Sequence, residues 1–106
     1  MTAEYGVELR NRTARITIKG KLDTTSAPGL SEELKKLQGQ EIDRVVFFVN
    51  ELEYISSAGL RVIIFAKQKV GVKADIYFIG AQQAVLDILK MTGLTNFLIC
   101  QDSYEE

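Results

Sequence analysis

The sequence predicts one α/β domain with a mixed, mostly parallel sheet that is covered by helices. The chain has 106 residues, close to the commonest size of a single domain. Apolar residues make up 46% of it, which is the ordinary share for a globular protein. Strand patterns alternate with helix patterns, and this order implies mostly parallel pairing with helical cover. No repeat, low-complexity segment or linker divides the chain, so we expect residues 1–106 to form a single domain.

The first half of the chain predicts a hairpin, a helix and a buried strand. Apolar and polar residues alternate over 5–10 and again over 14–19, and the short polar turn between them favours an antiparallel hairpin. After a loop, Ser26 is placed to cap a helix. Gly39 ends this helix, and three of its leucines share one face (Leu30, Leu34 and Leu37). The apolar run 45–49 is typical of a strand covered on both faces.

The second half predicts two further helices, over 60–70 and 82–92, and one strand after each of them. The first has an inner face of Ile63, Ala66 and Val70, and the second turns Ala84, Val85, Ile88 and Leu89 inward. The strands are 74–79 and 97–100, and Cys100 is expected to be buried in the latter. Gly93 is placed for a left-handed helix C-cap. The predicted order is therefore β-β-α-β-α-β-α-β.

Composition argues against several classes of partner. Lysine and arginine number 13 and acidic residues 14, so the formal charge of −1 offers no electrostatic case for nucleic acid or a membrane surface. No apolar run approaches the roughly 20 residues that span a bilayer, and the first residues do not resemble a signal peptide. The single cysteine cannot form a disulfide within the chain, which suits a reducing compartment. We therefore expect a cytoplasmic protein without nucleic-acid binding or membrane insertion.

The chain contains no histidine, and this absence makes catalysis improbable. It removes the serine and cysteine triads and the common zinc sites. Glu51 and Glu53 are the best pair of carboxylates for acid–base chemistry, but they fall in a short segment with no predicted cleft. No glycine-rich phosphate loop of the dinucleotide or P-loop type is present. We expect no catalytic residue, no metal and no cofactor, and a protein that acts by being bound.

The most distinctive segment is 50–61, which leaves the buried strand and enters the next helix through Ser56, Ser57, Ala58 and Gly59. One interpretation is structural: a serine caps the helix, and the glycine allows tight packing. The other is functional, because a serine at a helix N-terminus faces unpaired N–H groups and the positive end of the helix dipole. A phosphate is accommodated there and adds about −1.5 to −2 charges. Both interpretations remain open from spacing alone.

Three segments resemble STAS domain proteins and, among these, the stand-alone bacterial anti-sigma factor antagonists. Gly20-Lys21-Leu22-Asp23 followed by Ala27 is similar to the family's G-x-L-D loop. The segment 45–60 is similar to its strand, loop and phosphorylatable D-S-[STA]-G-L helix start. The segment 84–94, ending Met91-Thr92-Gly93-Leu94, is similar to its third helix and following loop. The resemblance covers nearly the whole chain.

The resemblance implies a role for each matched residue. Ser57 falls on the family's phosphoacceptor serine, Asp23 falls on the loop aspartate beside it, and Asn50 begins the loop into the site. In such proteins the unphosphorylated form binds an anti-sigma factor, often an ATP-dependent serine kinase, and thereby frees a sigma factor. Phosphorylation breaks this partnership and a phosphatase restores it. The expected partner-binding residues are Asp23, Thr24, Asn50, Ser56, Ser57, Ala58, Gly59, Arg61 and Phe65.

The last two residues of that set rest on an independent clue. On the predicted helix, Arg61, Phe65 and Gln68 point away from the inner face. A phenylalanine between a cation and an amide on a solvated face is out of place. It is explained either by a wide buried arc or by an apolar contact point for a partner.

The sequence departs from the family pattern at Ser56, where many members have aspartate. This makes Ser56 a second candidate acceptor. It also favours an alternative function, a STAS subunit that is not phosphorylated and is held in a larger complex such as a lipid transporter. A small-ligand sensor is a weaker hypothesis, because no convergent polar pocket can be identified from the sequence.

Overall fold

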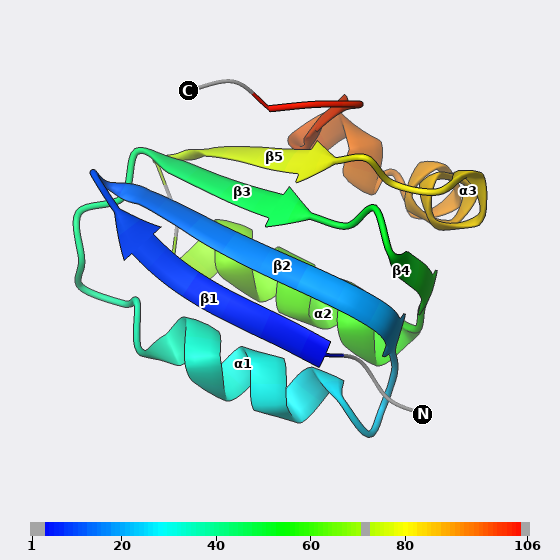
Figure 1. Ribbon diagram of the computed structural model, residues 1–106, viewed down its shortest axis with the longest axis horizontal. Coiled ribbons are helices and arrows are strands. Elements are labelled where there is room, and N and C mark those ends of the chain that lie inside the picture. The colour runs from blue at the N-terminus through cyan, green and yellow to red at the C-terminus, as the bar shows by residue number, and fades with distance from the viewer. Residues whose placement is uncertain (1–3, 71–72, 105–106) are drawn as a thin grey trace.

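The computed structural model describes residues 4–70 and 73–104. Figure 1 shows one sheet with helices packed against it. In chain order the elements are β1 (Glu4–Arg10), β2 (Thr13–Leu22), α1 (Ala27–Lys35), β3 (Arg44–Phe48), β4 (Leu52–Ile55), α2 (Ser57–Phe65), a π-helical turn η1 (Ala66–Val70), β5 (Asp75–Ile79), α3 (Gln83–Thr92), a 3-10 turn η2 (Leu94–Phe97) and β6 (Ile99–Gln101).

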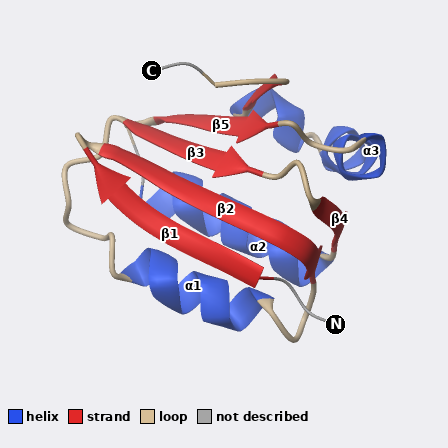
Figure 2. Ribbon diagram, viewed as in Figure 1, coloured by secondary structure: helices blue, strands red, loops and turns tan. Residues whose placement is uncertain are grey.

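The sheet has the strand order β1-β2-β3-β5-β6. Strands β1 and β2 form the predicted antiparallel hairpin, and the pairs β2–β3, β3–β5 and β5–β6 are parallel. Strand β4 pairs in parallel with the far end of β2, beyond a register shift at Gly20 and Lys21. Helices α1 and α2 lie side by side against the same face of the sheet (Figure 2). The predicted α/β class with a mixed, mostly parallel sheet is confirmed.

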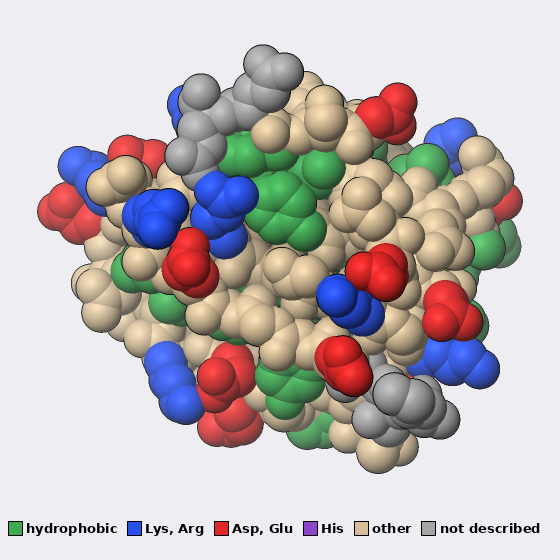
Figure 3. Space-filling view, viewed as in Figure 1, with side chains coloured by type: hydrophobic (Ala, Val, Ile, Leu, Met, Phe, Trp, Pro, Cys, Tyr) green, Lys and Arg blue, Asp and Glu red, His purple; other side chains and the backbone are tan. Residues whose placement is uncertain are grey.

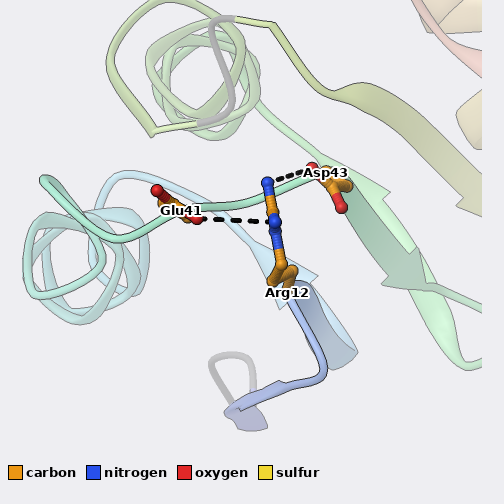
Figure 4. A network of polar contacts seen from close by, with 3 residues as sticks. All are labelled: Arg12, Glu41 and Asp43. Carbon is orange, nitrogen blue, oxygen red and sulfur yellow. Dashed lines mark hydrogen bonds and ion pairs between the residues drawn. The ribbon is translucent and has the colours of Figure 1, made fainter.

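The hairpin turn is fixed by backbone geometry and by two ion pairs. Asn11 and Arg12 both have positive φ, 50° and 65°, as expected for a two-residue turn that matches the twist of its strands. The Arg12 guanidinium contacts Asp43 at 3.1 Å and Glu41 at 3.5 Å (Figure 4). The Asp43 N–H donates to the Arg12 carbonyl oxygen at 2.7 Å. These contacts join the hairpin to the segment that leads into β3.

The core lies between the sheet and the helices. Alternation along β2 sends Ala14, Ile16 and Ile18 into this layer, where each is fully buried. From β3 and β5, Phe47 and Phe78 meet there with ring centroids 5.8 Å apart. All three leucines expected on one face of the first helical segment are buried (Leu30, Leu34 and Leu37). The predicted inner face of the second helix is also confirmed.

The opposite face of the sheet carries a small aromatic cluster. The Tyr104 ring lies edge-on to Phe48 and Tyr77, with centroid distances of 6.1 and 5.2 Å. Val46 and Ile79 lie on this face by alternation along β3 and β5, and both are buried. Figure 3 shows hydrophobic side chains gathered over β3 and β5 on this face. The run 45–49 is therefore covered on both faces, as its composition predicts.

Several predictions about individual elements are wrong. Residues 52–55, expected to be a loop, form β4, so the order is β-β-α-β-β-α-β-α-β. Helix α2 begins at Ser57, three residues before the predicted start, and its last turn is π-helical. The final strand is 99–101, because residues 94–97 form η2 after the left-handed Gly93 (φ 77°). Ala84 is exposed because it lies on the outer face of α3. Cys100 is exposed because β6 is a short edge strand.

Candidate functional site

Strand β4 leads directly into α2, and the residues at this junction determine how the helix begins. Ser56 is the N-cap residue, and its Oγ accepts a hydrogen bond from the Gly59 backbone N–H at 3.3 Å. The Ser56 backbone N–H donates to the carbonyl oxygen of Leu22 at 2.9 Å. The start of α2 is therefore attached to the end of β2, and the structural role expected of one serine belongs to Ser56.

Gly59 allows α2 to approach β2 closely. A Cβ atom at this position would lie 2.7 Å from the Leu22 carbonyl oxygen and 2.8 Å from Cγ1 of Ile55. Both distances are shorter than nonbonded carbon contacts allow, and one involves backbone that cannot rotate away. Glycine is therefore required here by close packing rather than by its φ angle. Gly59, which the sequence placed in the binding set, is buried at this close contact.

Ser57 is the first residue of α2, and it is exposed. The free N–H groups and the dipole of a helix give this end a partial positive charge. The first turn of α2 contains no acidic residue. Arg61 follows four residues later, on the same helix face, and is also exposed. A negative charge added to the Ser57 hydroxyl would therefore meet a helix N-terminus and an arginine.

The loop after β2 is held by Asp23. Its Oδ1 accepts hydrogen bonds from the backbone N–H groups of Ser26 at 3.1 Å and Thr25 at 3.0 Å. The backbone bond from Ser26 has the largest effect and holds the pKa of the Asp23 carboxyl below its ordinary value of 3.8. Desolvation opposes this effect, and the bond from Thr25 adds to the lowering. Because Asp23 follows Leu22, whose carbonyl oxygen contacts the start of α2, this loop lies beside the Ser56–Ser57 junction.

Ser26 does not cap α1 with its side chain, which corrects the prediction made for it. It occupies the N-cap position, but its backbone is helical (φ −93°, ψ −27°) and its side chain makes no cap bond. Instead, its hydroxyl donates to the Lys21 carbonyl oxygen and accepts from the Asp23 backbone N–H, both at 2.9 Å. Ser26 and Asp23 therefore stabilise one turn of the loop together.

A groove of about 370 Å³ opens between α1 and α2. Four of the predicted binding residues lie on its walls: Thr24, Ala58, Arg61 and Phe65. Phe65 is half-buried, so part of its ring faces the groove. Arg61 is the only charged residue among the described residues that line it. Ser57 is exposed and directly precedes Ala58, so it lies at the edge of this groove. The groove is mostly apolar and has one cation, Arg61, among its described lining residues.

The remaining walls of the groove were not identified from the sequence. They come from α1 and the inner side of α2 (Ala27, Pro28, Ser31 and Val62). Each helix shows its own apolar face in the sequence, but the packing of one helix against the other depends on the sheet beneath them. Pro28 at the start of α1 was recognised only as a helix-start signal, although it also faces the groove.

Asn50 lies apart from this groove. Its backbone carbonyl accepts a hydrogen bond from Nε2 of Gln82 at 3.0 Å. Its side chain lies against Gly80, where a Cβ atom would come within 2.8 Å of the Asn50 Nδ2. Strand β4, about 13 Å long at the usual rise per residue, separates Asn50 from Ser56. Asn50 therefore packs against the segment that leads into α3 and does not line the groove.

The candidates for acid–base chemistry do not converge. Glu51 forms an exposed ion pair with Lys19 at 3.3 Å, and Glu53 is exposed on β4. Over residues 4–70 and 73–104, no group of three or more cysteine or acidic side chains could hold a metal ion. Among the helices in this part of the chain, none is long and apolar enough to cross a membrane.

Comparisons with known proteins agree with this arrangement. A curated Bordetella bronchiseptica protein, named as a candidate anti-sigma factor antagonist, BtrV, is 29% identical over 89 residues, which cover 83% of this chain and 77% of that protein. An anti-sigma factor antagonist from Mycobacterium paratuberculosis has the same fold, with a TM-score of 0.83 at 18% identity, over 96% of this chain and 87% of that one.

The phosphorylated form of the Bacillus cell fate determinant SpoIIAA also shares the fold. Its TM-score is 0.74 at 14% identity, over 96% of this chain and 93% of that one. The sequence pattern of the STAS domain matches residues 6–106. Since the match spans nearly the whole sequence and the fold is that of solved anti-sigma factor antagonists, this chain belongs to the STAS domain family.

Proposed function

We propose that this chain is an anti-sigma factor antagonist whose partner docks over the α1–α2 groove beside Ser57. The observation that carries the proposal is the exposed hydroxyl at the first residue of α2, at the edge of a groove lined by Arg61 and Phe65. STAS membership and the names of its relatives support this class of partner. The bound anti-sigma factor would release its sigma factor, and the chain acts in the cytoplasm by association rather than catalysis.

The chemistry of the groove indicates what the partner presents. The half-buried Phe65 and the apolar parts of Ala58 and Val62 favour an apolar side chain. Arg61, with no carboxylate among the described lining residues, favours an acidic group beside it. The predicted contact is therefore an apolar anchor next to an aspartate or glutamate on the anti-sigma factor.

Phosphorylation of Ser57 would switch this contact off. The phosphate adds about −1.5 to −2 charges and would repel the partner's acidic group. Arg61, one turn along the helix, would pair with the phosphate and so be withdrawn from the partner. The modification leaves the helix cap intact, because the capping hydroxyl belongs to Ser56. A kinase, often the anti-sigma factor itself, and a separate phosphatase complete the cycle.

Ser56 is the less suitable acceptor. Its Oγ is engaged with the Gly59 N–H, and Ser56 is less exposed than Ser57. The aspartate that many family members have here would accept the same N–H bond, since aspartate and serine are equally good N-cap residues. The departure at Ser56 therefore leaves the helix start unchanged and is compatible with phosphorylation of Ser57.

The second candidate function is a STAS subunit that is never phosphorylated and remains in a larger complex such as a lipid transporter. The departure at Ser56 is the observation that favours it. Incubation with ATP and a kinase-type anti-sigma factor from the same genomic neighbourhood, followed by intact-mass measurement, separates the two. One phosphate on the wild type, retained in Ser56→Ala and absent in Ser57→Ala, supports the antagonist. An unmodified wild type that still copurifies with a transporter complex would establish the second function instead.

A further inference from the structure

Helix α2 has a second flank that the proposed function does not use. Its α1 side carries Arg61 and Phe65, whereas Ile64 and Lys67 face the 3-10 turn η2. Between α2 and η2 lies another groove of about 340 Å³. This volume is at the low end of the range for pockets that hold ligands, about 300–1,000 Å³. We call it the α2–η2 groove.

The walls of the α2–η2 groove are apolar and its floor is buried. The floor is formed by Ile63 and Leu98, which are 1% and 8% exposed. The rims are formed by Ile64 and Phe97, which are 36% and 62% exposed. Single exposed apolar residues are ordinary, but here two large ones line one recess. Phe97 is the last residue of η2, the turn that follows the left-handed Gly93 at the end of α3.

One end of the α2–η2 groove is positively charged. Lys67 lines the groove, and its Nζ donates to the carbonyl oxygen of Ala74 at 3.1 Å. Lys67 is the one charged side chain among the described residues that line this groove. The other polar lining residue is Gln68, and no carboxylate lines the groove among the described residues. An occupant with apolar and acidic groups is therefore complementary to it in both shape and charge.

We propose that the α2–η2 groove is a second docking surface, whose occupant is an acidic amphipathic helix of another protein. In helix-in-groove recognition, an amphipathic helix lays its apolar face into a hydrophobic groove. Here the groove lies between α2 and η2. A membrane surface is a poorer fit, because a flat bilayer would reach Phe97 but not the floor at Ile63 and Leu98. The proposal is independent of phosphorylation at Ser57, since the two grooves lie on opposite flanks of α2.

The test uses the full chain and two labelled synthetic peptides of equal length. One has leucine along one helical face and glutamate elsewhere, and the other replaces every glutamate with lysine. Fluorescence anisotropy should show that the glutamate peptide binds at least about tenfold more tightly, which is a difference of about 1.4 kcal/mol. Loss of a central aromatic contact in Phe97→Ala should weaken binding by about tenfold. The matched control is Met91→Ala on α3, an exposed apolar residue that lines neither groove, and it should change binding less than about twofold.

Two further variants separate the roles of charge and packing. Lys67→Gln should reduce the preference for the glutamate peptide, and Phe97→Glu should abolish its binding by repulsion. Because Phe97 is exposed, neither of its variants should unfold the domain. Equal affinity for the two peptides, no binding of either, or unchanged binding by Phe97→Ala would each overturn the proposal. The membrane alternative is tested by cosedimentation of the chain with phosphatidylcholine–phosphatidylglycerol vesicles. If the chain cosediments with the vesicles only when Phe97 is present, and the glutamate peptide does not bind, the groove would be assigned to a membrane instead.

Discussion

Two adjacent serines with different roles make a matched pair of variants. The Ser56 hydroxyl caps α2 through the Gly59 N–H, whereas the Ser57 hydroxyl has no hydrogen-bond partner within residues 4–70 and 73–104. We predict that Ser56→Ala destabilises the domain and that Ser57→Ala does not. Both substitutions remove the same hydroxyl group from neighbouring positions, so any difference between them comes from the environment.

The size of the difference follows from the cap geometry. Loss of an N-cap serine costs about 0.5–2 kcal/mol, and the 3.3 Å bond lies just beyond the usual range of about 2.7–3.2 Å, so we expect about 1 kcal/mol for Ser56→Ala. For a domain of this size that is a fall in Tm of roughly 4–8 °C. Ser57→Ala removes no bond at an exposed site and should stay within about 0.5 kcal/mol of the wild type.

Urea unfolding followed by circular dichroism measures both values. Ser56→Asp is the control, because an aspartate accepts the same bond and its charge interacts favourably with the helix dipole, worth about 0.3–1 kcal/mol. It should therefore be at least as stable as the wild type. If Ser57→Ala lost as much stability as Ser56→Ala, the assignment of the cap to Ser56 and of a free hydroxyl to Ser57 would be refuted.

Three further predictions concern neighbouring residues. Gly59→Ala should lower the free energy of unfolding by about 1–2 kcal/mol, because overpacking against Leu22 outweighs the better helix propensity of alanine; an unchanged value in a urea titration contradicts the close contact. Asp23 has a folded pKa below its unfolded value, so its contribution is present at neutral pH and is lost as the pH falls below about 4. Asp23→Asn should therefore flatten the acid limb of the stability curve, and an acid limb as steep as that of the wild type would count against this. In the phosphorylated protein, Arg61→Gln should raise the pKa of the Ser57 phosphate, measured by phosphorus NMR; no shift would show that Arg61 and the phosphate do not pair.

Most of the fold was predictable because the helices and the long strands carry clear apolar periodicity. Strand β4 was missed because only its two ends, Leu52 and Ile55, are buried, while Glu53 and Tyr54 between them are exposed. That pattern is neither alternating nor continuously apolar, and the strand exists because the far end of β2 provides a partner. The start of α2 was placed late because apolar periodicity begins only at Leu60, whereas the helix begins after its N-cap.

Part of the candidate site was predictable. Ser57 was identified by its resemblance to the phosphoacceptor serine of the STAS motif, and Phe65 from its place on an otherwise polar helix face. Asn50 was expected in the site because it begins the segment that leads to Ser57, but β4 carries the chain away from it. The contribution of Val62 to the groove depends on how α2 packs against α1, and no single-helix periodicity contains that information.

The most direct measurement is a calorimetric titration of the anti-sigma factor with this chain, unphosphorylated and then phosphorylated at Ser57. If Ser57 controls docking over the α1–α2 groove, the modified form should bind at least about tenfold more weakly, a loss of about 1.4 kcal/mol. Equal dissociation constants for the two forms would contradict the role given to this hydroxyl.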